Sequence, residues 1–207
     1  MADKAKLLEV LGKIIADVNE QKDFLTQLDN VIGDGDHGIN LDRGFKAVEK
    51  QMPSYADLGV DEILKDVGKQ LMKVVGGSSG PLYGQAYKKA GVYLKGKTEI
   101  TMDDLLAMLD IAIEQIQRLG HAVEGEKTMI DSMIPASKAM KESYAADGDA
   151  KKALEAGVAA AEAGIEYTKT IIATKGRASY LGERSLGHQD PGATSFTLML
   201  KAIAELA

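Results

Sequence analysis

Three aspartates lie close together in a glycine-rich segment that runs from residue 29 to residue 40. A single glycine separates Asp34 from Asp36, so their carboxylates can point the same way only from an extended or looped backbone. Asp29 precedes Asp34 by five residues. Like charges this close repel one another unless a cation lies among them, and Mg²⁺ is usually held by a few carboxylates together with waters and phosphates. The segment therefore predicts a magnesium site.

This acidic segment has two other interpretations, a solvated turn and a calcium loop. A solvated acidic turn stays open, because Asp-Gly pairs are common in turns. A calcium loop of the EF-hand type does not fit. With Asp34 at its first position, the sixth and twelfth positions would be Ile39 and Phe45, where that loop requires Gly and Glu.

A second glycine-rich connection, residues 76–81, reads Gly-Gly-Ser-Ser-Gly-Pro. Glycine lets the backbone approach a phosphate closely, and the hydroxyls of Ser78 and Ser79 can donate to its oxygens together with N–H groups at a helix start. The segment is not a Walker A loop, because it lacks the Gly-Lys-Ser/Thr ending. It indicates a phosphate-binding loop, and an ordinary turn between two helices is the alternative.

A third connection, residues 174–192, is long for a loop between helices, which favours a functional role. It contains Arg177, whose planar guanidinium could bind phosphate oxygens. A solvated surface charge is the alternative for this arginine. Asp190 followed by Pro191 is typical of a helix N-cap and the first helical position.

Histidine, lysine and methionine supply the remaining candidates. Of the three histidines, only His37 lies among the acidic residues, where it could hydrogen-bond a phosphate or a carboxylate. A phosphohistidine carrier is a further hypothesis, but no histidine has the apolar, helix-N-terminal setting expected of such a site. Beyond Gly120, Lys127 adds a cation and Met129 an apolar side chain that could cover an adenine.

The composition limits the class of protein. The chain has 207 residues, which suits one domain, 1–207. It has no cysteine, which excludes disulfides and thiolate sites and fits a reducing cytoplasm. No run of about 18 apolar residues occurs, so we expect no membrane span and a cytoplasmic protein. The formal net charge of -6 argues against nucleic acid as a partner.

Helices must position these loops, because apolar residues recur at helical spacing along nearly the whole chain. Strand-like alternation is nearly absent, so the sequence predicts an all-α fold. Thr101 and Asp104 form a capping box that should open one helix. We expect eight helices, near residues 4–28, 39–51, 61–75, 81–95, 101–119, 128–145, 150–174 and 191–206.

Taken together, three segments resemble the nucleotide-binding subunit of bacterial dihydroxyacetone kinases. They are Asp-x4-Asp-Gly-Asp-His-Gly-x-Asn at residues 29–40, GSSGPLYG at residues 77–84, and residues 176–193, which contain GRASYLGER and HQDPGA. All three occur in order, and the match covers essentially the whole chain. The resemblance implies an eight-helix antiparallel barrel with ADP or ATP and two Mg²⁺ ions at one end, ringed by the loops.

The same resemblance implies roles for individual residues. Asp29, Asp34 and Asp36 would bind the magnesium ions, and the phosphates would bridge both ions. The phosphates and the metal shell would be contacted by His37, which is also given a catalytic role, and by Gly38, Ile39, Asn40, Ser78 and Ser79. The rest of the nucleotide pocket would be lined by Gly120, Met129, Arg177, Asp190, Pro191 and Gly192.

Partners also follow from the resemblance. No general base is evident in this chain, and the related systems bind dihydroxyacetone through a histidine of a separate subunit. A chain of 207 residues is too short to hold both halves of the fused, ATP-dependent enzymes. We therefore expect a phosphoenolpyruvate-dependent system, in which bound ADP is rephosphorylated by a phosphohistidine protein of the phosphotransferase system.

Two alternative functions stay open at this point. One is an ATP-dependent kinase subunit that acts on another small ketose or on a carrier-bound fatty acid. The other is a non-catalytic Mg-nucleotide sensor that binds a transcriptional regulator. Both would share every motif described above.

Overall fold

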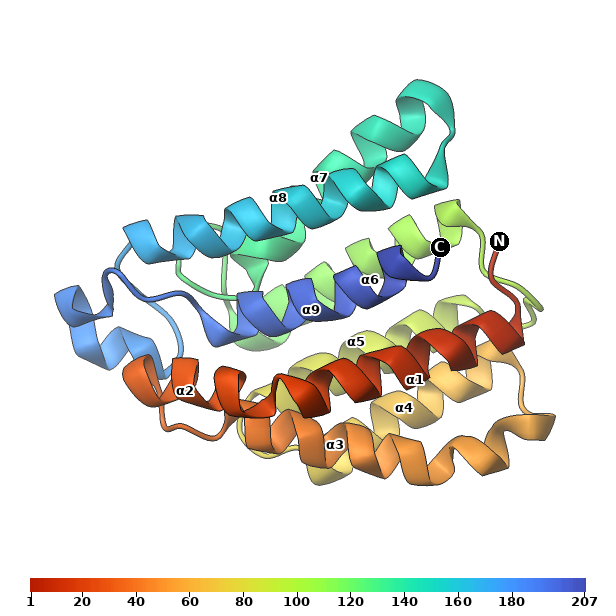
Figure 1. The fold of residues 1–207 in the computed structure, drawn as a ribbon, viewed down its shortest axis with the longest axis horizontal. Coiled ribbons are helices and arrows are strands. Elements are labelled where there is room, and N and C mark those ends of the chain that lie inside the picture. The colour runs from red at the N-terminus through yellow and green to blue at the C-terminus, as the bar shows by residue number, and fades with distance from the viewer.

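The computed structural model describes residues 1–207 and confirms the all-α class (Figure 1). Two 3₁₀ segments, η1 (Met52–Asp57) and η2 (Arg177–Ser185), join the longer helices, and the one extended pairing is an isolated bridge between Ala2 and Ile100. None of the helices combines the length and apolar character that a membrane span needs. The nine α-helices are α1 (Lys4–Glu20), α2 (Lys22–Ile32), α3 (His37–Gln51), α4 (Val60–Val74), α5 (Ser79–Tyr93), α6 (Met102–Gly120), α7 (Ile130–Asp147), α8 (Ala150–Thr170) and α9 (Pro191–Glu205).

The helices form a closed ring. From α3 to α9 each helix packs against the next one in sequence, and α9 returns to pack against α1. Helix α1 also packs against α3, and α2 contacts α3 and α9, so α1 and α2 share one position in the ring (Figure 1). All nine helices contribute to one cluster of 38 buried apolar residues. The core therefore lies inside the ring.

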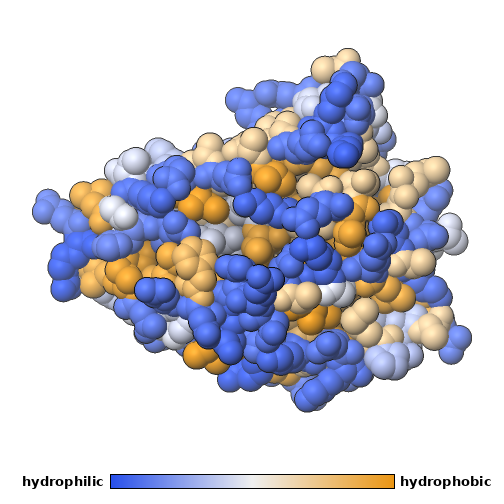
Figure 2. Space-filling view, in the orientation of Figure 1, coloured by the Kyte–Doolittle hydropathy of each residue, from blue (hydrophilic) through white to orange (hydrophobic).

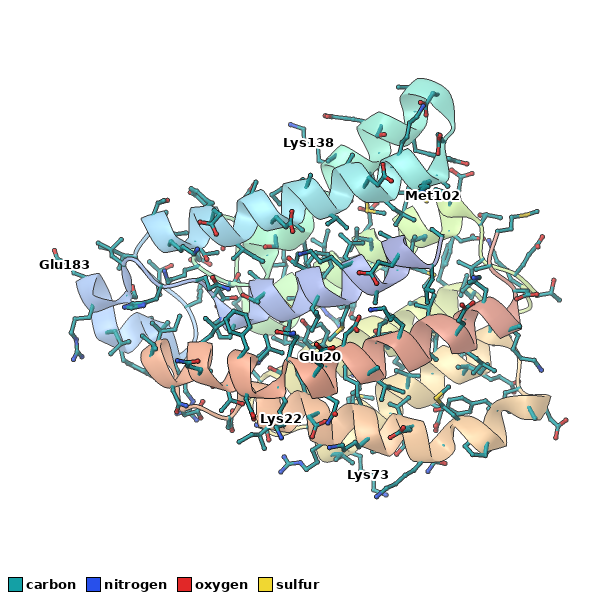
Figure 3. The ribbon with its side chains drawn as sticks, in the orientation of Figure 1. Glu20, Lys22, Lys73, Met102, Lys138 and Glu183 are labelled. Carbon is teal, nitrogen blue, oxygen red and sulfur yellow. The ribbon has the colours of Figure 1, made fainter.

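The first predicted helix is two helices in the structure. Residues 4–28 were expected to be continuous, but the chain bends at Gln21, between Glu20 and Lys22 (Figure 3). The hydrogen-bond ladder passes through the bend, because the N–H of Gln21 donates to the oxygen of Asp17. Helix α2 then continues to Ile32, and Asp29 lies in its last turn rather than in a loop. The C-cap of the helix is Gly33, so the helix continues past the first aspartate.

The other predicted helices occur within a few residues of their expected bounds. The capping box is confirmed, since the Thr101 hydroxyl accepts from the N–H of Asp104 and the Asp104 carboxylate accepts from the N–H of Thr101. Helix α8 ends at Thr170 rather than near residue 174. The 3₁₀ segments η1 and η2 were not predicted.

Helices α4 and α5 approach each other closely at two glycines. A Cβ atom on Gly68 would lie 2.4 Å from the backbone oxygen of Gly84. A Cβ atom on Gly84 would lie 2.3 Å from Cγ of Met72. Any larger residue would push the two helices apart and displace the turn between them, which carries residues 76–79.

The two ends of the molecule can be told apart in the figures. Glu183 in η2 marks one end in Figure 3, and Met102 at the start of α6 marks the other. Hydrophilic side chains cover much of the face in Figure 2, with hydrophobic patches between them, as expected of helices that bury one stripe. The three glycine-rich connections lie at the η2 end (Figure 1).

Candidate functional site

A pocket of about 230 Å³ lies where the three glycine-rich connections meet. Its walls are the α2–α3 connection, the turn before α5, the segment between α6 and α7, the residues that lead into η2, and the start of α9. Only 6 of its 24 lining residues are hydrophobic, so the pocket suits a polar ligand.

The structure brings the three predicted metal-binding aspartates together in this pocket. Carboxylate oxygens of Asp29, Asp34 and Asp36 all lie within 4.8 Å of one another. Asp29 is buried, and its Oδ2 accepts hydrogen bonds from the N–H groups of Asp36 at 2.9 Å and His37 at 3.1 Å. These two bonds fold the α2–α3 connection back onto the end of α2.

Two glycines make this fold of the connection possible. A Cβ atom on Gly33 would lie 1.9 Å from Oδ1 of Asp29. Gly35 has a φ of +73°, and a Cβ atom there would lie 1.9 Å from Oδ1 of Asn30. A side chain on Gly33 would displace Asp29 of the acidic cluster, and one on Gly35 would displace Asn30 and strain the backbone, which explains the Gly-Asp-Gly-Asp pattern.

The donor set fits a hard divalent cation. All three candidate ligands supply carboxylate oxygens, which are typical of Mg²⁺ and Ca²⁺ sites, whereas zinc and copper favour nitrogen or sulfur donors. Exposure rises from the buried Asp29 through Asp36 to the exposed Asp34. Nε of Arg177 lies 2.7 Å from Oδ2 of Asp34 and balances one of the three charges.

His37, the first residue of α3, is held on both sides of its ring. It is 7% exposed, with Nδ1 at 3.0 Å from Oγ of Ser79 and Nε2 at 2.9 Å from Oγ of Ser195. Burial lowers the pKa of His37, against the opposing influence of the Asp29 and Asp36 carboxylates. The imidazole is therefore neutral at neutral pH, and both of its nitrogens are occupied within the protein.

The turn before α5 lines the pocket beside the aspartates. Gly76, Gly77, Ser78 and Ser79 all contribute to the wall, and Gly77 has a φ of +63°. Helix α5 begins at Ser79, two residues earlier than expected. No side chain caps its first turn, so its N–H groups are free for an anionic ligand.

Three predicted residues lie outside the pocket wall. Gly38 packs against α2, where a Cβ atom would lie 2.0 Å from the backbone oxygen of Lys22. Ile39 is 49% exposed, and Oδ1 of Asn40 accepts a hydrogen bond of 2.6 Å from Arg43. Contact of these three residues with a nucleotide stays a prediction.

The remaining predicted residues also line the pocket. They are Gly120, Met129, Arg177, Asp190, Pro191 and Gly192. Asp190 caps α9 as expected, since its Oδ2 accepts from the N–H of Ala193 at 2.7 Å. Burial raises the pKa of Asp190 to about 7, and the neighbouring Asp131 carboxylate acts in the same direction.

Lys127 has a structural contact that its sequence position does not reveal. It is 1% exposed, and Nζ donates to the backbone oxygen of Thr168 and, at 3.3 Å, to that of Ile171. The lysine thus satisfies carbonyl groups at the end of α8. Burial lowers its pKa, although the carboxylates of Asp190 and Asp131 oppose this.

Sequence analysis missed two residues of the site, Tyr83 and Ser195. Tyr83 follows the glycine-serine turn by one helical turn, and its hydroxyl lies 2.8 Å from Oγ of Ser195. Ser195 is separated from His37 by 158 residues, and it looks like any small residue within a helix. The spacing of Tyr83 from Ser79 at i and i+4 was the one available signal.

The chain is thus an all-α protein with a polar pocket and clustered aspartates at one end of a ring of helices. Comparison with known families identifies the family of such proteins to which it belongs. The model of the DAK2 domain matches residues 31–205. The chain therefore belongs to the DAK2 domain family.

Individual relatives cover nearly the whole chain. It is 41% identical over 184 residues to the phosphoenolpyruvate-dependent dihydroxyacetone kinase, ADP-binding subunit DhaL, of Escherichia coli K12, covering 89% of this chain and 88% of the relative. It is 40% identical over 205 residues to the ADP-binding subunit DhaL of kinase 2 of Listeria innocua, covering 98% and 94%.

A solved structure shares the fold. The dihydroxyacetone kinase of C. freundii, determined in complex with AMP-PNP and Mg²⁺, superposes with a TM-score of 0.77 and 26% sequence identity. The match covers 99% of this chain but 34% of that chain. The present chain therefore corresponds to about a third of that larger enzyme.

Proposed function

We propose that this chain is the ADP-binding subunit of a phosphoenolpyruvate-dependent dihydroxyacetone kinase. The observation that carries the proposal is the meeting of Asp29, Asp34 and Asp36 with the glycine-serine turn in one polar pocket. Relatives that are 41% and 40% identical bear that name, which supports the same function here. We also propose that residues 1–207 are one domain, because all nine helices share one core.

The aspartates are suited to hold two Mg²⁺ ions against the phosphates of ADP or ATP. When bound, the ions neutralise charge on the transferred phosphoryl group and on the leaving group. Asp29 is prepared for this role, since Oδ2 receives two N–H donors while Oδ1 has no hydrogen bond within the chain. The exposed Asp34 lies at the solvent side of the cluster, where an ion can enter.

Several groups of the chain itself are placed to bind the nucleotide. The free N–H groups at the start of α5 are suited to phosphate oxygens. Arg177 pairs with Asp34 in this structure, and we infer that it turns to a phosphate when a nucleotide binds, because its guanidinium pairs well with phosphate oxygens. Met129 also lines the pocket, and its apolar side chain is suited to cover a base.

His37 is not free to act as a general base. Both ring nitrogens of His37 contact serine hydroxyls, so accepting a proton or a phosphoryl group there would break a contact. This disfavours a phosphohistidine at His37 and leaves it a role in positioning. We infer that the acceptor sugar and its base belong to a partner subunit, and that a phosphotransferase-system phosphohistidine protein rephosphorylates the ADP.

A reconstituted transfer reaction tests the function. The chain with MgADP, the dihydroxyacetone-binding subunit and the phosphorylated phosphotransferase-system protein are mixed, and dihydroxyacetone phosphate is followed over time. We expect turnover without added ATP, with omission of the chain as the control. Product that forms only when ATP is supplied would indicate an ATP-dependent kinase subunit. No product under either condition would indicate a regulatory nucleotide sensor.

A further inference from the structure

A buried chain of hydrogen bonds lies behind the aspartates and joins α3, α5 and α9. Oγ of Ser195 lies 2.9 Å from Nε2 of His37, 2.8 Å from the hydroxyl of Tyr83 and 3.1 Å from the backbone oxygen of Gly192. On the other side of the imidazole, Nδ1 lies 3.0 Å from Oγ of Ser79. His37 and Ser79 line the pocket, whereas Ser195 and Tyr83 lie behind it. The network therefore runs from the core to the pocket wall.

The number of available hydrogens determines which group donates in each hydrogen bond of this network. A serine hydroxyl has one hydrogen and two lone pairs, and a backbone oxygen can only accept. With the hydrogen of Ser195 in the bond to Gly192, Tyr83 and His37 both donate to Ser195. His37 thus carries its hydrogen on Nε2. At a pH above the ordinary pKa of imidazole, ~6.5, the ring is neutral, and Nδ1 then accepts the hydrogen of Ser79.

We propose that Ser195, supported by Tyr83, is a positioning residue that fixes the tautomer and orientation of His37 and directs the hydroxyl hydrogen of Ser79 away from the pocket. Oγ of Ser79 then offers only lone pairs to the pocket. These lone pairs can coordinate a metal ion or accept a hydrogen bond from a metal-bound water molecule. They cannot donate a hydrogen bond to a phosphate oxygen. Contact of Ser79 with a bound phosphate, expected from the sequence, stays a prediction for the nucleotide complex.

Position and burial support this role. Ser195 is 0% exposed and Tyr83 is 4% exposed, so neither reaches a ligand, and both act only through their neighbours. His37 directly follows Asp36, and its N–H donates to Asp29, so its position is tied to that of two candidate metal ligands. Hydrogen-bond partners behind metal ligands commonly set metal affinity in this way. The nature of the ligand rests on the proposed function, whereas the hydrogen-bond order is a property of the chain itself.

Nitrogen-15 NMR of the imidazole rings reads the tautomer directly. The chain has three histidines, so the signals of His37 are identified by their loss in a His37→Gln variant. In the wild-type protein without nucleotide we expect the Nε2–H tautomer alone. In Ser195→Ala, which removes the acceptor for Nε2–H, we expect a mixture of tautomers. We also expect MgADP binding to weaken by about 10-fold, the lower end of the loss seen for direct hydrogen-bond partners of metal ligands, because Ser195 acts through His37.

Two further variants separate positioning from general destabilisation. Tyr83→Phe keeps the acceptor on Ser195, so we expect the wild-type tautomer and a smaller loss of affinity. Thr197→Val removes another buried hydroxyl of α9, which donates only to the backbone oxygen of Ala193 at 2.8 Å. We expect this control to change neither the tautomer nor the affinity.

The wild-type spectrum alone can overturn the proposal, whether or not any variant folds. An Nδ1–H tautomer of His37 would reverse the direction of the network and return a free hydrogen to Ser79. An unchanged His37 spectrum in folded Ser195→Ala would also contradict it. A wild-type chain that shows the Nε2–H tautomer but binds no MgADP would contradict the proposed function and leave the positioning of His37 by Ser195 standing.

Discussion

Two pockets of similar size lie at opposite ends of the helical ring, and their chemistry differs. The pocket near η2 has a volume of about 230 Å³, and 6 of its 24 lining residues are hydrophobic. The pocket near Met102 has a volume of about 270 Å³, and 17 of its 20 lining residues are hydrophobic. The packed helices thus leave a pocket at each end of the ring. The volumes of the two pockets do not show which of them is the functional site.

The helix dipole does not distinguish the two ends either. Helices α5 and α9 begin at the polar pocket, and α6 and α8 begin near the apolar one. N–H groups at helix starts are therefore present at both ends. Glycine-rich connections and clustered carboxylates occur at one end only of this pair. We conclude that the connections, rather than the helices, give the molecule a site for a metal and an anion.

The largest expected effect concerns the apolar end. Leu11 lines that pocket and is 1% exposed. We expect Leu11→Ala to lower the free energy of unfolding by about 2–5 kcal/mol, because it removes a buried side chain and enlarges the cavity. MgADP affinity should not change. Urea denaturation and calorimetry check the two parts, and a parallel loss of affinity would show that the two ends are coupled.

The reverse pattern is expected at the polar end. Asp36→Asn removes a candidate metal ligand, so we expect Mg-dependent nucleotide affinity to fall by at least ~100-fold, since losing only a partner behind a ligand costs ~10–100-fold. The free energy of unfolding should stay the same or rise, because the substitution relieves repulsion between carboxylates. Calorimetry with MgADP and urea denaturation measure the two effects.

A matched control for Asp36→Asn is available on α2. Asp23 has a side chain that is 93% exposed, so Asp23→Asn changes the net charge equally without touching the pocket. We expect this variant to bind MgADP like the wild type. Full binding by Asp36→Asn would reject the metal site, and an equal loss in both variants would point to net charge instead.

A smaller effect is expected from Asp190, whose pKa burial raises to about 7 in the folded protein. The unfolded value is ~3.9, so the folded state binds the proton more tightly. Its contribution to stability is therefore fully present below about pH 4 and is lost as the pH rises through about 7. Asp190→Asn keeps a good N-cap residue but removes this titration.

Comparing how the free energy of unfolding changes with pH in the wild type and in Asp190→Asn separates the effect of Asp190 from that of the other acidic residues. Between about pH 5 and pH 8, we expect the free energy of unfolding to fall more steeply in the wild type than in Asp190→Asn, by ~1.4 kcal/mol for each pH unit between pH 5 and the folded-state pKa. Urea denaturation at the two pH values measures the difference. Parallel pH profiles would show that Asp190 titrates near its ordinary value.

Features that depend on neighbouring residues were readable from the sequence. The apolar stripes of the helices, the capping box of α6 and the N-cap at Asp190 all follow from local spacing, and the structure confirms them. The clustering of Asp34 and Asp36 was also predictable, because one glycine between two aspartates excludes a helical arrangement. The sequence was sufficient here since the interacting atoms lie within a few residues.

Features that depend on tertiary contacts could not be predicted from the sequence. Asp29 looked like part of a loop, but its place in the last turn of α2 is fixed by N–H groups that arrive from residues 36 and 37. Ser195 meets His37 only because α9 packs back beside α1 and α2. Lys127 was expected to be a free cation, but its Nζ donates a hydrogen bond to the backbone oxygen of Thr168 near the end of α8. No local pattern encodes which distant group such a residue will meet.

The fate of nucleotide on the purified protein tests the central claim most directly. Release from the polar pocket would strip metal–phosphate contacts, so a subunit that is rephosphorylated in place should hold its nucleotide tightly. The protein is purified without chelator, passed through gel filtration and denatured, and the released nucleotide is identified by chromatography. Exchange of the native protein against labelled ATP is then timed. We predict bound ADP that survives gel filtration and exchanges more slowly than one catalytic turnover, whereas protein free of nucleotide, or exchange within one turnover, would contradict the claim.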